Sequence, residues 1–391
     1  MSKLERLIQQ YCPDGVEWIK IRDMAQVGTG SSNGNEADED GKYPFFVRSQ
    51  IVKHKNNFEY DEEAIIIPGE GGIGDIFHYI KGKYALHQRV YRIHFTSQQI
   101  NVKFAFYYMK SAFKRFIMTK AVSATVTSIR KPMIEDFEIP VPPLPVQEEI
   151  VRILDTFTEL QAELQAELQA ELQKRKQQYN YYRDNLLSFK GRTDVEWKKL
   201  GEIASIKTGR RFVRTDIRES GVPCFHYGDI YTYYGLTATQ TKGYLDKELA
   251  KKLRFAQPND VVVVCAGEND MDIGVGVAWL GDKPAVVHDA CCILHHNQSP
   301  RYISHFLRTH NYHLQMKKYV KNGKISSLPA SGLAEALIPL PSFEEQERIA
   351  AILDRFDTLT NDLTSGLPAE MEKRRQQYEY YRDRLLTFKR L

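Results

Sequence analysis

Apolar side chains recur every three or four residues along two long stretches of the chain. From about Gln147, the first stripe runs through Ile150, Ile153, Leu154, Phe157, Leu160, Leu164, Leu168 and Leu172. This spacing places the apolar side chains on one face of a helix. A continuous helix of about 43 residues would be roughly 65 Å long at 1.5 Å per residue. Before it, the chain is expected to stay extended because of three prolines, Pro142, Pro143 and Pro145.

The second stripe repeats the first. It runs through Ile349, Ile352, Leu353, Phe356, Leu359, Leu363, Leu367 and Met371. Gly366 and Pro368 interrupt it, so we expect a break or a kink there, because a proline ring clashes with the preceding turn of a helix. Two such stripes in one chain would bury each other as an antiparallel, coiled-coil-like pair of helices. The pair is expected to act as a spacer between globular domains.

The stripes belong to an internal repeat. Segments that enter and leave each stripe match at an offset of 199: residues 139–155 (IPVPPLPVQEEIVRILD) and 175–190 recur as 338–354 and 374–389. The sequences VEWIK from residue 16 and VEWKK from residue 195 match at an offset of 179. The second copy therefore holds 20 more residues, most of them before the apolar run at 261–264. Between the matched edges the copies differ, which indicates one scaffold with two different surfaces. Drift after an old duplication is the alternative.

The divergent segments have a mixed pattern. Short apolar runs predict strands at 64–67, 261–264 and 285–288, and amphipathic spacing predicts helices at 103–120 and 301–319. We therefore expect an α+β protein with two globular α/β domains, joined by two long antiparallel helices and related by a pseudo-two-fold internal repeat. The expected boundaries are 1–145 for the first domain, 146–190 for the first spacer, 191–340 for the second domain and 341–391 for the second spacer.

Charge separates the two kinds of segment. The net charge of +4, from 54 Lys and Arg against 50 Asp and Glu, argues against a histone-like polycation. Residues 16–140 carry +2 and residues 195–338 carry +5, whereas 146–190 carry −2 and 339–391 carry −1. The positive balance thus lies in the divergent segments, where basic residues are interleaved with aromatic and turn residues. A modest positive charge favours a reader of DNA sequence over a non-specific DNA coat.

Loops rich in hydrogen-bond donors are the candidate DNA contacts, because such side chains bind phosphates and base edges. The loop before the final strand of each domain is the foremost candidate. The candidate residues are Ser31, Arg48, Gln50, Arg89, Ser128 and Arg130 in the first domain, and Arg210, Arg211, Tyr227, Lys324 and Ser326 in the second. Base-reading and phosphate-holding roles stay open at this stage.

Both long helices end in the motif QQYxYYRDxLLxFK. Its aromatic side chains share one face and combine an apolar body with a polar tip, which is typical of protein interfaces. We expect two equivalent partner contacts through Tyr179, Tyr182, Phe189, Tyr378, Tyr381 and Phe388. Alternatively, these aromatics close the core of the scaffold itself.

A four-residue repeat, LQAELQAELQAELQ at residues 160–173, lies inside the first predicted helix. Each unit adds about 6 Å of helix, and DNA rises about 3.4 Å per base pair. If the helix runs parallel to a duplex, one unit corresponds to one or two base pairs, and the tract is a molecular ruler. Filler with good helix propensity is the alternative, and the two are compatible.

Patterns that suggest chemistry in this chain are weak. Residues 69–74 fit GxGxxG, but a dinucleotide site also needs a helix opening there and a later acid, so a tight turn is favoured. Asp14 and Asp40 fit a loose PD…DxK nuclease pattern that is common by chance. Cys291 and Cys292, with several histidines nearby, lack the spacing of a zinc site. Without a Walker loop or an NPPY-type motif, the chain is expected to have no catalytic residues and no metal.

The sequence also predicts a cytoplasmic location without membrane contact. The longest apolar runs, such as 261–266, are far below the roughly 20 residues that span a bilayer. Residues 1–11 are charged and amphipathic, unlike a secretory signal. Five cysteines in 391 residues do not form a disulfide framework.

Taken together, the pattern resembles the specificity subunit of type I restriction–modification systems, and the tetrapeptide repeat is similar to that of the IC subfamily. The likeness covers essentially the whole chain. It rests on two divergent domains, two similar long helices and the motifs that begin and end them. It implies that each divergent domain is a target recognition domain that reads one half of a split, asymmetric site on double-stranded DNA.

The same resemblance implies partners and cofactors. The helices would set the spacing of the half-sites and bind two methyltransferase (modification) subunits, and restriction/translocase subunits would complete the nuclease. Adenine methylation with S-adenosylmethionine, and the use of ATP and Mg, would belong to those subunits, with no cofactor bound by this chain. The interruption at Gly366 and Pro368 departs from a continuous second helix. A structural adaptor with two protein-binding heads, or a self-contained nuclease, is the alternative.

Overall fold

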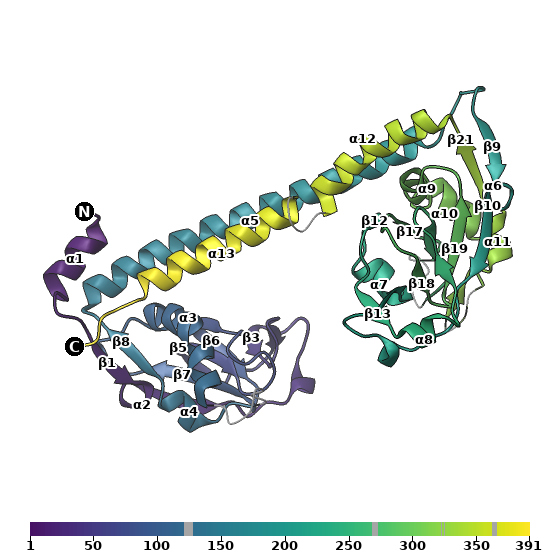
Figure 1. Cartoon of the computed structure of the whole chain (residues 1–391). Coiled ribbons are helices and arrows are strands. Elements are labelled where there is room, and N and C mark those ends of the chain that lie inside the picture. The colour runs from purple at the N-terminus through teal and green to yellow at the C-terminus, as the bar shows by residue number, and fades with distance from the viewer. Residues whose placement is uncertain (121–127, 268–272, 322, 324, 362–365) are drawn as a thin grey trace. The chain divides into compact units, whose positions relative to one another are not determined.

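A computed structural model describes residues 1–120, 128–267, 273–321, 323, 325–361 and 366–391. The chain forms two compact units (Figure 1). The first unit comprises residues 1–166 and 372–391, and the second comprises residues 167–371. Each unit therefore contains one divergent segment together with parts of both long helical stretches. No helix in the described residues is both long enough and apolar enough to cross a membrane.

The first unit is built around a six-stranded sheet in the order β2-β7-β5-β6-β3-β4, with a separate two-stranded ribbon, β1-β8. Helix α3 packs against β5 and β8. The elements are α1 (Lys3–Tyr11), β1 (Glu17–Lys20), α2 (Ile21–Met24), β2 (Ala25–Thr29), η1 (Gly34–Glu36), β3 (Tyr43–Phe46), β4 (Lys53–Lys55), β5 (Tyr60–Pro68), β6 (His78–Leu86), β7 (Val90–Phe95), α3 (Val102–Lys120), α4 (Lys131–Glu135), β8 (Glu138–Val141), the first part of α5 (Leu144–Leu186) and most of α13 (Leu367–Leu385).

The second unit has a five-stranded sheet, β10-β19-β15-β17-β12, and a four-stranded sheet, β13-β11-β18-β14, with the two-stranded ribbons β16-β20 and β21-β9. Besides the end of α5, its elements are β9 (Glu196–Lys199), α6 (Leu200–Ile203), β10 (Ala204–Thr208), η2 (Arg214–Asp216), β11 (Val222–Phe225), α7 (Tyr227–Thr232), β12 (Thr237–Ala238), β13 (Gly243–Leu245), α8 (Lys247–Ala250), β14 (Phe255–Ala256), β15 (Val261–Val264), β16 (Ala266–Gly267), β17 (Gly276–Trp279), β18 (Ala285–Val287), β19 (Cys291–His296), α9 (Pro300–Phe306), α10 (His310–Met316), β20 (Ser326–Ser327), α11 (Ala330–Ala334), β21 (Leu337–Leu340) and α12 (Phe343–Asn361).

The two sheet systems are variants of one plan. In the first unit, β6 pairs antiparallel with β5 and parallel with β3, so one strand joins both sets of strands. In the second unit, β17 pairs with β15 and β18 pairs with β11, and residues 280–284 separate the two strands. The single sheet of the first unit is therefore divided in the second. Most of the additional residues of the second copy precede β15, as expected, and they build α7, β12 and α8.

The predicted strands and the helix at 103–120 are confirmed as β5, β15, β18 and α3. The single helix expected at 301–319 is wrong, because two helices occupy this stretch. α9 ends at Phe306, and Thr309 begins α10 as an N-cap whose side chain accepts a hydrogen bond from the N–H of Tyr312 (3.2 Å). A capping hydroxyl in the middle of an amphipathic pattern starts a new helix without changing the apolar spacing.

The long helix α5 begins earlier than the prolines suggested. It starts at Leu144, so Pro145 lies inside its first turn, where the missing N–H has no helical acceptor in any case. The predicted interruption of the second stretch is confirmed, because α12 ends at Asn361 and α13 begins at Leu367. Gly366 provides the first carbonyl of α13, which accepts from the N–H of Glu370 (3.2 Å), and Pro368 stands in the first turn.

The stripe on α5 is buried only at its start. In the first unit, Val146, Ile150 and Leu154 lie in the core beneath α3, whereas Phe157 and Leu160 are 37% and 56% exposed. In the second unit, Ile349, Ala350 and Leu353 of α12 are buried in the same way. About the first three turns of each helix thus belong to a domain core, and the LQAE tract of α5 starts soon after that burial ends.

A buried glutamine anchors each helix to its domain. In the first unit, Gln147 Oε1 accepts from the N–H of Asn101 (2.8 Å), while Nε2 donates to the carbonyls of Gln99 (2.8 Å) and Pro142 (2.6 Å). In the second unit, Gln346 Oε1 accepts from the N–H of Ser299 (3.1 Å), while Nε2 donates to the carbonyl of Pro341 (3.0 Å) and to Oε1 of Gln298 (2.8 Å). Both amides are buried with donors and acceptors paired.

Two turns further on, a matched aspartate makes a second attachment. Asp155 accepts from Lys103 Nζ and from the hydroxyl of Tyr107, both at 2.8 Å. Asp354 accepts from Arg301 Nη1 (2.9 Å) and lies 2.8 Å from His305 Nε2. The helix supplies the same carboxylate in both units, whereas the domain supplies different partners. The repeat therefore keeps the carboxylate that accepts these bonds, while the donors differ.

The C-terminal residues close the first unit. The N–H of Val16 donates to the carbonyl of Lys389 (2.9 Å), and the N–H of Leu391 donates to the carbonyl of Val16 (3.1 Å). Arg390 forms an ion pair with Glu138 of β8 (2.9 Å). The second unit has Val195 at the place of Val16, and there the chain runs on directly from the end of α5. In the first unit, hydrogen bonds thus join the segment after a long helix to the first strand of the domain. In the second unit, the chain itself makes this connection.

The glutamine anchors predict a matched pair of defects. Gln147→Ala would leave three main-chain groups without their partner and a cavity at a buried site. We expect it to lower the free energy of unfolding by about 1–3 kcal/mol, measured by chemical denaturation, with faster hydrogen exchange around Asn101. Gln346→Ala should lower the free energy of unfolding by a similar amount and speed hydrogen exchange around Ser299. The exposed Gln173→Ala serves as the control, and a loss of similar size in that variant would contradict the anchoring role.

Candidate nucleic-acid interface

Three loops of the first unit meet at one junction, formed by residues 47–50, 69–72 and 87–89. The N–H of His87 donates to the carbonyl of Phe46 (3.0 Å), and the N–H of Gly69 donates to the carbonyl of Arg89 (2.9 Å). The segment before α4 joins them, because the N–H of Ile129 donates to the carbonyl of Gly69 (2.8 Å). Main-chain bonds from the ends of β3, β5 and β6 thus hold the junction to the sheet.

Two predicted DNA-contact arginines share one carboxylate at this junction. Arg48 Nη1 and Arg89 Nη1 both donate to Oε2 of Glu70, at 3.1 and 2.9 Å. Glu70 also forms an isolated β-bridge with Ser128. The guanidinium of Arg89, and then that of Arg48, holds the pKa of Glu70 below its usual range. The structure therefore brings together Arg48, Arg89 and Ser128, which the sequence could assign only one by one.

The loop of Ser31 lies against the same junction. The N–H of Gln88 donates to the carbonyl of Ser32 (3.0 Å), and Glu59 Oε2 accepts from the N–H of Ser31 (2.9 Å). Only glycine fits at position 30, since a Cβ there would lie 1.8 Å from the carbonyl oxygen of Leu86. Ser31 is exposed, as are Gln50, which follows Arg48 on its loop, and Arg130, the N-cap of α4.

The second unit repeats the junction with other side chains. Arg210 and Arg211 are exposed on the loop after β10, and Arg210 Nη1 donates to the carbonyl of Lys252 (2.8 Å). Tyr227 lies beside two histidines, with ring centroids 4.7 Å from His226 and 5.3 Å from His288. Burial lowers the pKa of both histidines, which favours neutral imidazoles at neutral pH.

One predicted contact of the second domain, Ser326, differs from expectation, and another lies outside the described residues. Ser326 is only 4% exposed and pairs with Gly267 in the β16-β20 ribbon, so its burial does not support a direct base contact. Lys324 lies outside the described residues. Sequence reasoning missed Glu70, His226 and His288. A glutamate in a glycine-rich turn carries no signal of its own, because its partners are 22 and 19 residues away and meet it only in the folded chain.

The aromatic motif that ends each long helix divides into buried and exposed members. Tyr179 and Phe189 are 5% and 7% exposed, and the Tyr179 hydroxyl lies 3.1 Å from His305 Nδ1. Their burial supports the alternative of a scaffold core and not a partner contact. The ring of Tyr182 stacks on that of Phe356, with 5.4 Å between the ring centroids, and Tyr182 is still 38% exposed.

The second copy of the motif is more open. The Tyr378 hydroxyl lies 3.0 Å from Thr158 Oγ1, and Phe388 packs edge-on against Phe104 at 6.1 Å. Tyr381 is 44% exposed. The most exposed rings are two that the prediction omitted, Tyr181 and Tyr380, at 66% and 61%. These two stand at equivalent positions of the repeat, so each helix carries the same exposed aromatic residue.

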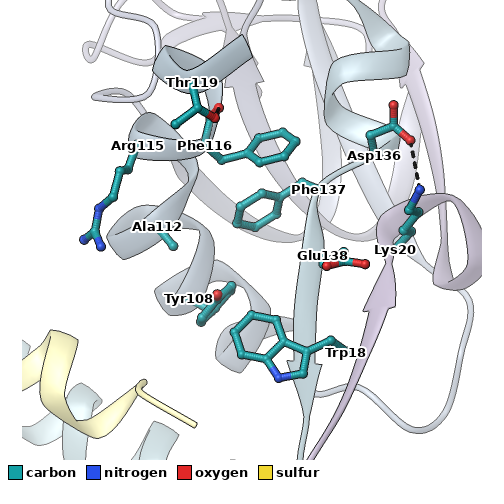
Figure 2. Close-up of a pocket in the computed structure, with 10 residues that line it drawn as sticks. All are labelled: Trp18, Lys20, Tyr108, Ala112, Arg115, Phe116, Thr119, Asp136, Phe137 and Glu138. Atoms are coloured by element: carbon teal, nitrogen blue, oxygen red, sulfur yellow. Dashed lines mark hydrogen bonds and ion pairs between the residues drawn. The ribbon is translucent and has the colours of Figure 1, made fainter. Parts of the chain in front are cut away.

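A pocket of about 540 Å³ beside the β1-β8 ribbon of the first unit has a different character. Figure 2 shows its aromatic rings gathered between α3 and β8, with Trp18 and Tyr108 edge-on at 5.8 Å. Burial raises the pKa of Tyr108 to about 12. The charged residues of the lining balance one another: Lys20, Arg115, Asp136 and Glu138. None of the predicted DNA-contact residues that the structure describes lines this pocket, so we assign it to the framework.

The weak chemical patterns have structural explanations. Gly71, Gly72 and Gly74 have positive φ angles in the turn between β5 and β6, and no helix opens there. Cys291 and Cys292 are buried in β19. Within the described part of the chain, no group of three or more His, Cys, Asp or Glu side chains is placed to hold a metal ion. Asp14 lies in a bend and Asp40 in a turn.

Comparison with known proteins identifies the class to which this architecture belongs. Residues 13–174 and 193–373 match the family described as the type I restriction modification DNA specificity domain. The two matches cover most of the chain and fall one on each copy of the repeat. The chain therefore belongs to the family of type I restriction–modification specificity subunits. Such a subunit recognises DNA, and the enzymatic activities of the system lie in its partner subunits.

Individual relatives agree. The chain is 36% identical over 252 residues to the EcoR124I/EcoR124II specificity subunit of Escherichia coli, which covers 63% of this chain and 60% of the relative. It is 30% identical over 397 residues to the EcoprrI specificity subunit of Escherichia coli, covering 93% and 92%. A type I specificity subunit of Haemophilus influenzae is 27% identical over 406 residues and covers 98% of each chain.

Solved structures support the α+β fold. A chain from a study of complex assembly and conformational transition in the type I system has a TM-score of 0.69 at 14% identity and covers 96% of this chain and 98% of its own. The HsdS subunit from Thermoanaerobacter tengcongensis has a TM-score of 0.51 at 15% identity and covers 96% and 97%. At these identities the likeness concerns the fold alone.

Substitutions in the buried and in the exposed aromatics are expected to lower stability by very different amounts. Phe189→Ala removes a buried ring and is expected to lower the free energy of unfolding by about 3–5 kcal/mol. Tyr181→Ala removes an exposed ring and should change it by less than about 0.5 kcal/mol. Denaturant titration of the two variants beside the parent chain measures both. A large loss from Tyr181→Ala would show that this ring, too, belongs to the core.

Proposed function

We propose that residues 1–145 and 191–340 each read one half of a two-part, asymmetric site on double-stranded DNA. The observation that carries this proposal is the duplicated loop junction. One main-chain arrangement appears in both units, and it presents different hydrogen-bond donors and rings in each. Two equal surfaces would suit a symmetric site, whereas two different surfaces suit half-sites of different sequence.

The chemistry of the first junction suits base reading. Arginine is the side chain that best matches guanine in the major groove, because its fork of donors meets O6 and N7 together. Arg48 and Arg89 are about half exposed and are held by loops fixed to the sheet. The exposed Ser31, Gln50 and Arg130 add donors around them, suited to phosphates or bases. Ser128 remains a candidate at the bridge to Glu70.

The second junction offers a mixed surface. Arg210 and Arg211 supply positive charge, and Tyr227 with the two neutral histidines supplies rings and hydrogen-bonding nitrogens. The larger net charge of residues 195–338, +5 against +2, favours more phosphate contacts in this domain. Lys324 remains a candidate on sequence grounds.

The spacers 146–190 and 341–391 set the distance between the half-sites in this proposal. α5 is a single helix over 43 residues, and the LQAE tract lies within it at the point where domain burial ends. A helix extends by about 1.5 Å per residue, so its length changes in fixed steps. The tract can therefore change length without disturbing a domain core.

The same spacers are proposed to dock two methyltransferase subunits. The matched exposed aromatics, Tyr181 with Tyr182 and Tyr380 with Tyr381, offer one equivalent contact on each helix. Tyr378 and Phe388 are partly buried against Thr158 and Phe104, and they remain candidates at the edge of the second contact. Restriction/translocase subunits would complete the complex. S-adenosylmethionine, ATP and Mg would then be bound by the partners, in the cytoplasm.

Exchange of one reading domain tests the division of labour. Replacing residues 16–140 by the matching segment of another family member should change one half of the methylated site and leave the other half as it was. Methylation mapping of a genome that carries the complete system gives the readout. Exchange of residues 195–338 is the reciprocal control and should change the other half. A change in both halves from either exchange would contradict two independent readers.

The ruler hypothesis has its own test. Deleting one LQAE unit from residues 160–173 should shorten the gap between the half-sites by one or two base pairs, because the helix loses about 6 Å. Both half-site sequences should stay the same. Insertion of one further unit is the matched control and should lengthen the gap. An unchanged gap in either variant would show that the tract is filler.

A further inference from the structure

The loop junction has the same main chain in both units. The N–H of Gly69 donates to the carbonyl of Arg89 (2.9 Å), and the N–H of Cys265 donates to the carbonyl of Ala290 (2.8 Å). His87 Nδ1 accepts from the N–H of Arg89 (3.0 Å), and His288 Nδ1 accepts from that of Ala290 (3.1 Å). These bonds make Arg89 and Ala290 structural counterparts.

The other two correspondences follow from the pairing of the strands. Phe46 pairs with Leu86 in parallel register, and Phe225 pairs with Val287 in the same way, so Arg48 corresponds to Tyr227 two residues on. Glu70 bridges to Ser128, and Ala266 pairs with Ser327. Since Ser128 and Ser327 stand at the repeat offset of 199, Glu70 corresponds to Ala266.

The three side chains at these positions differ as a set. The first unit has an arginine, a glutamate and a second arginine, and the second unit has Tyr227, Ala266 and Ala290. The charged side chains at these three positions are all replaced by uncharged ones, while the main-chain bonds stay. The main-chain bonds of the junction form in the second unit without these three charged side chains, so the side chains are free to serve recognition.

Geometry indicates what Glu70 does. Two guanidinium groups at one place repel each other, and a carboxylate oxygen between them offsets that repulsion. Each arginine donates a single N–H to Glu70, and no other hydrogen bond of the two guanidiniums is found among the described residues. Both therefore keep a pair of donors for a ligand while their position is fixed.

We propose that Glu70 is a positioning residue that determines specificity in the first recognition domain: it fixes Arg48 and Arg89 to read guanine. At the three corresponding positions the second domain presents uncharged side chains, Tyr227, Ala266 and Ala290, to a different base pair. Bidentate donation to O6 and N7 of guanine demands a defined orientation of the arginine fork, which the shared carboxylate supplies. This inference rests on the proposed reading of one half-site by residues 1–145.

The test uses the complete methyltransferase complex with the parent chain, Glu70→Gln and Asp75→Asn. Asp75 is a matched control, because it also lies between β5 and β6 and forms an exposed ion pair, with Lys114 at 2.7 Å. Binding is measured to the cognate duplex, to duplexes with single substitutions in either half-site, and to DNA without the site. Glutamine keeps the size and one acceptor but removes the charge.

For Glu70→Gln we expect roughly a 10-fold loss of discrimination at one or two guanine-containing base pairs of the first half-site. Discrimination in the second half-site should not change. Affinity for DNA without the site should stay equal or rise, because a negative charge has gone. Asp75→Asn should match the parent in every measurement.

Three results would overturn the inference. They are unchanged discrimination with Glu70→Gln, an equal loss of affinity for every duplex, and a first half-site that contains no guanine. Failure of the underlying function would look different, because the parent complex itself would then bind without distinguishing substitutions in the first half-site.

Discussion

A side-chain amide removed from water has to satisfy its donor and its acceptor at once, and this requirement fixes where each long helix begins. Gln147 and Gln346 meet it through groups of the adjoining domain and of the proline segment just before the helix. Leaving such groups unpaired costs more than the bond itself contributes. The amide therefore selects one position of the helix start on its domain. The matched aspartates two turns later confirm the same register.

Stability and recognition are assigned to different parts of each unit. Main-chain bonds and buried side chains hold the loop junction in place, so the partly exposed side chains at positions 48, 70 and 89 are free to differ from their counterparts. Exposed ion pairs contribute little to folding in general. The Arg48–Glu70–Arg89 group therefore matters for where donors point, and its replacement by Tyr227, Ala266 and Ala290 in the second unit leaves the fold intact.

Most of the features of the fold that could be predicted came from periodic patterns in the sequence. The repeat, α5, the three strands β5, β15 and β18, and the break at Gly366 follow from spacing and from residues with fixed backbone preferences. The helix at 301–319 was wrong because Thr309 caps α10 without altering the apolar pattern. Tyr179 and Phe189 looked like interface residues because their neighbour, α9, is more than a hundred residues away in sequence. Glu70 was missed for a similar reason, since its partners Arg48, Arg89 and Ser128 come from separate segments of the chain.

Among the described residues, the side-chain amide of Gln147 forms its hydrogen bonds to the variable domain with main-chain groups. It accepts from the N–H of residue 101 and donates to the carbonyl of residue 99, and neither bond depends on the side chain at those positions. An unrelated segment that presents the same two groups satisfies the anchor without compensating mutations. Recombination between two such genes at the matched edges can therefore create a new specificity in a single step, with the assembly surfaces already in place.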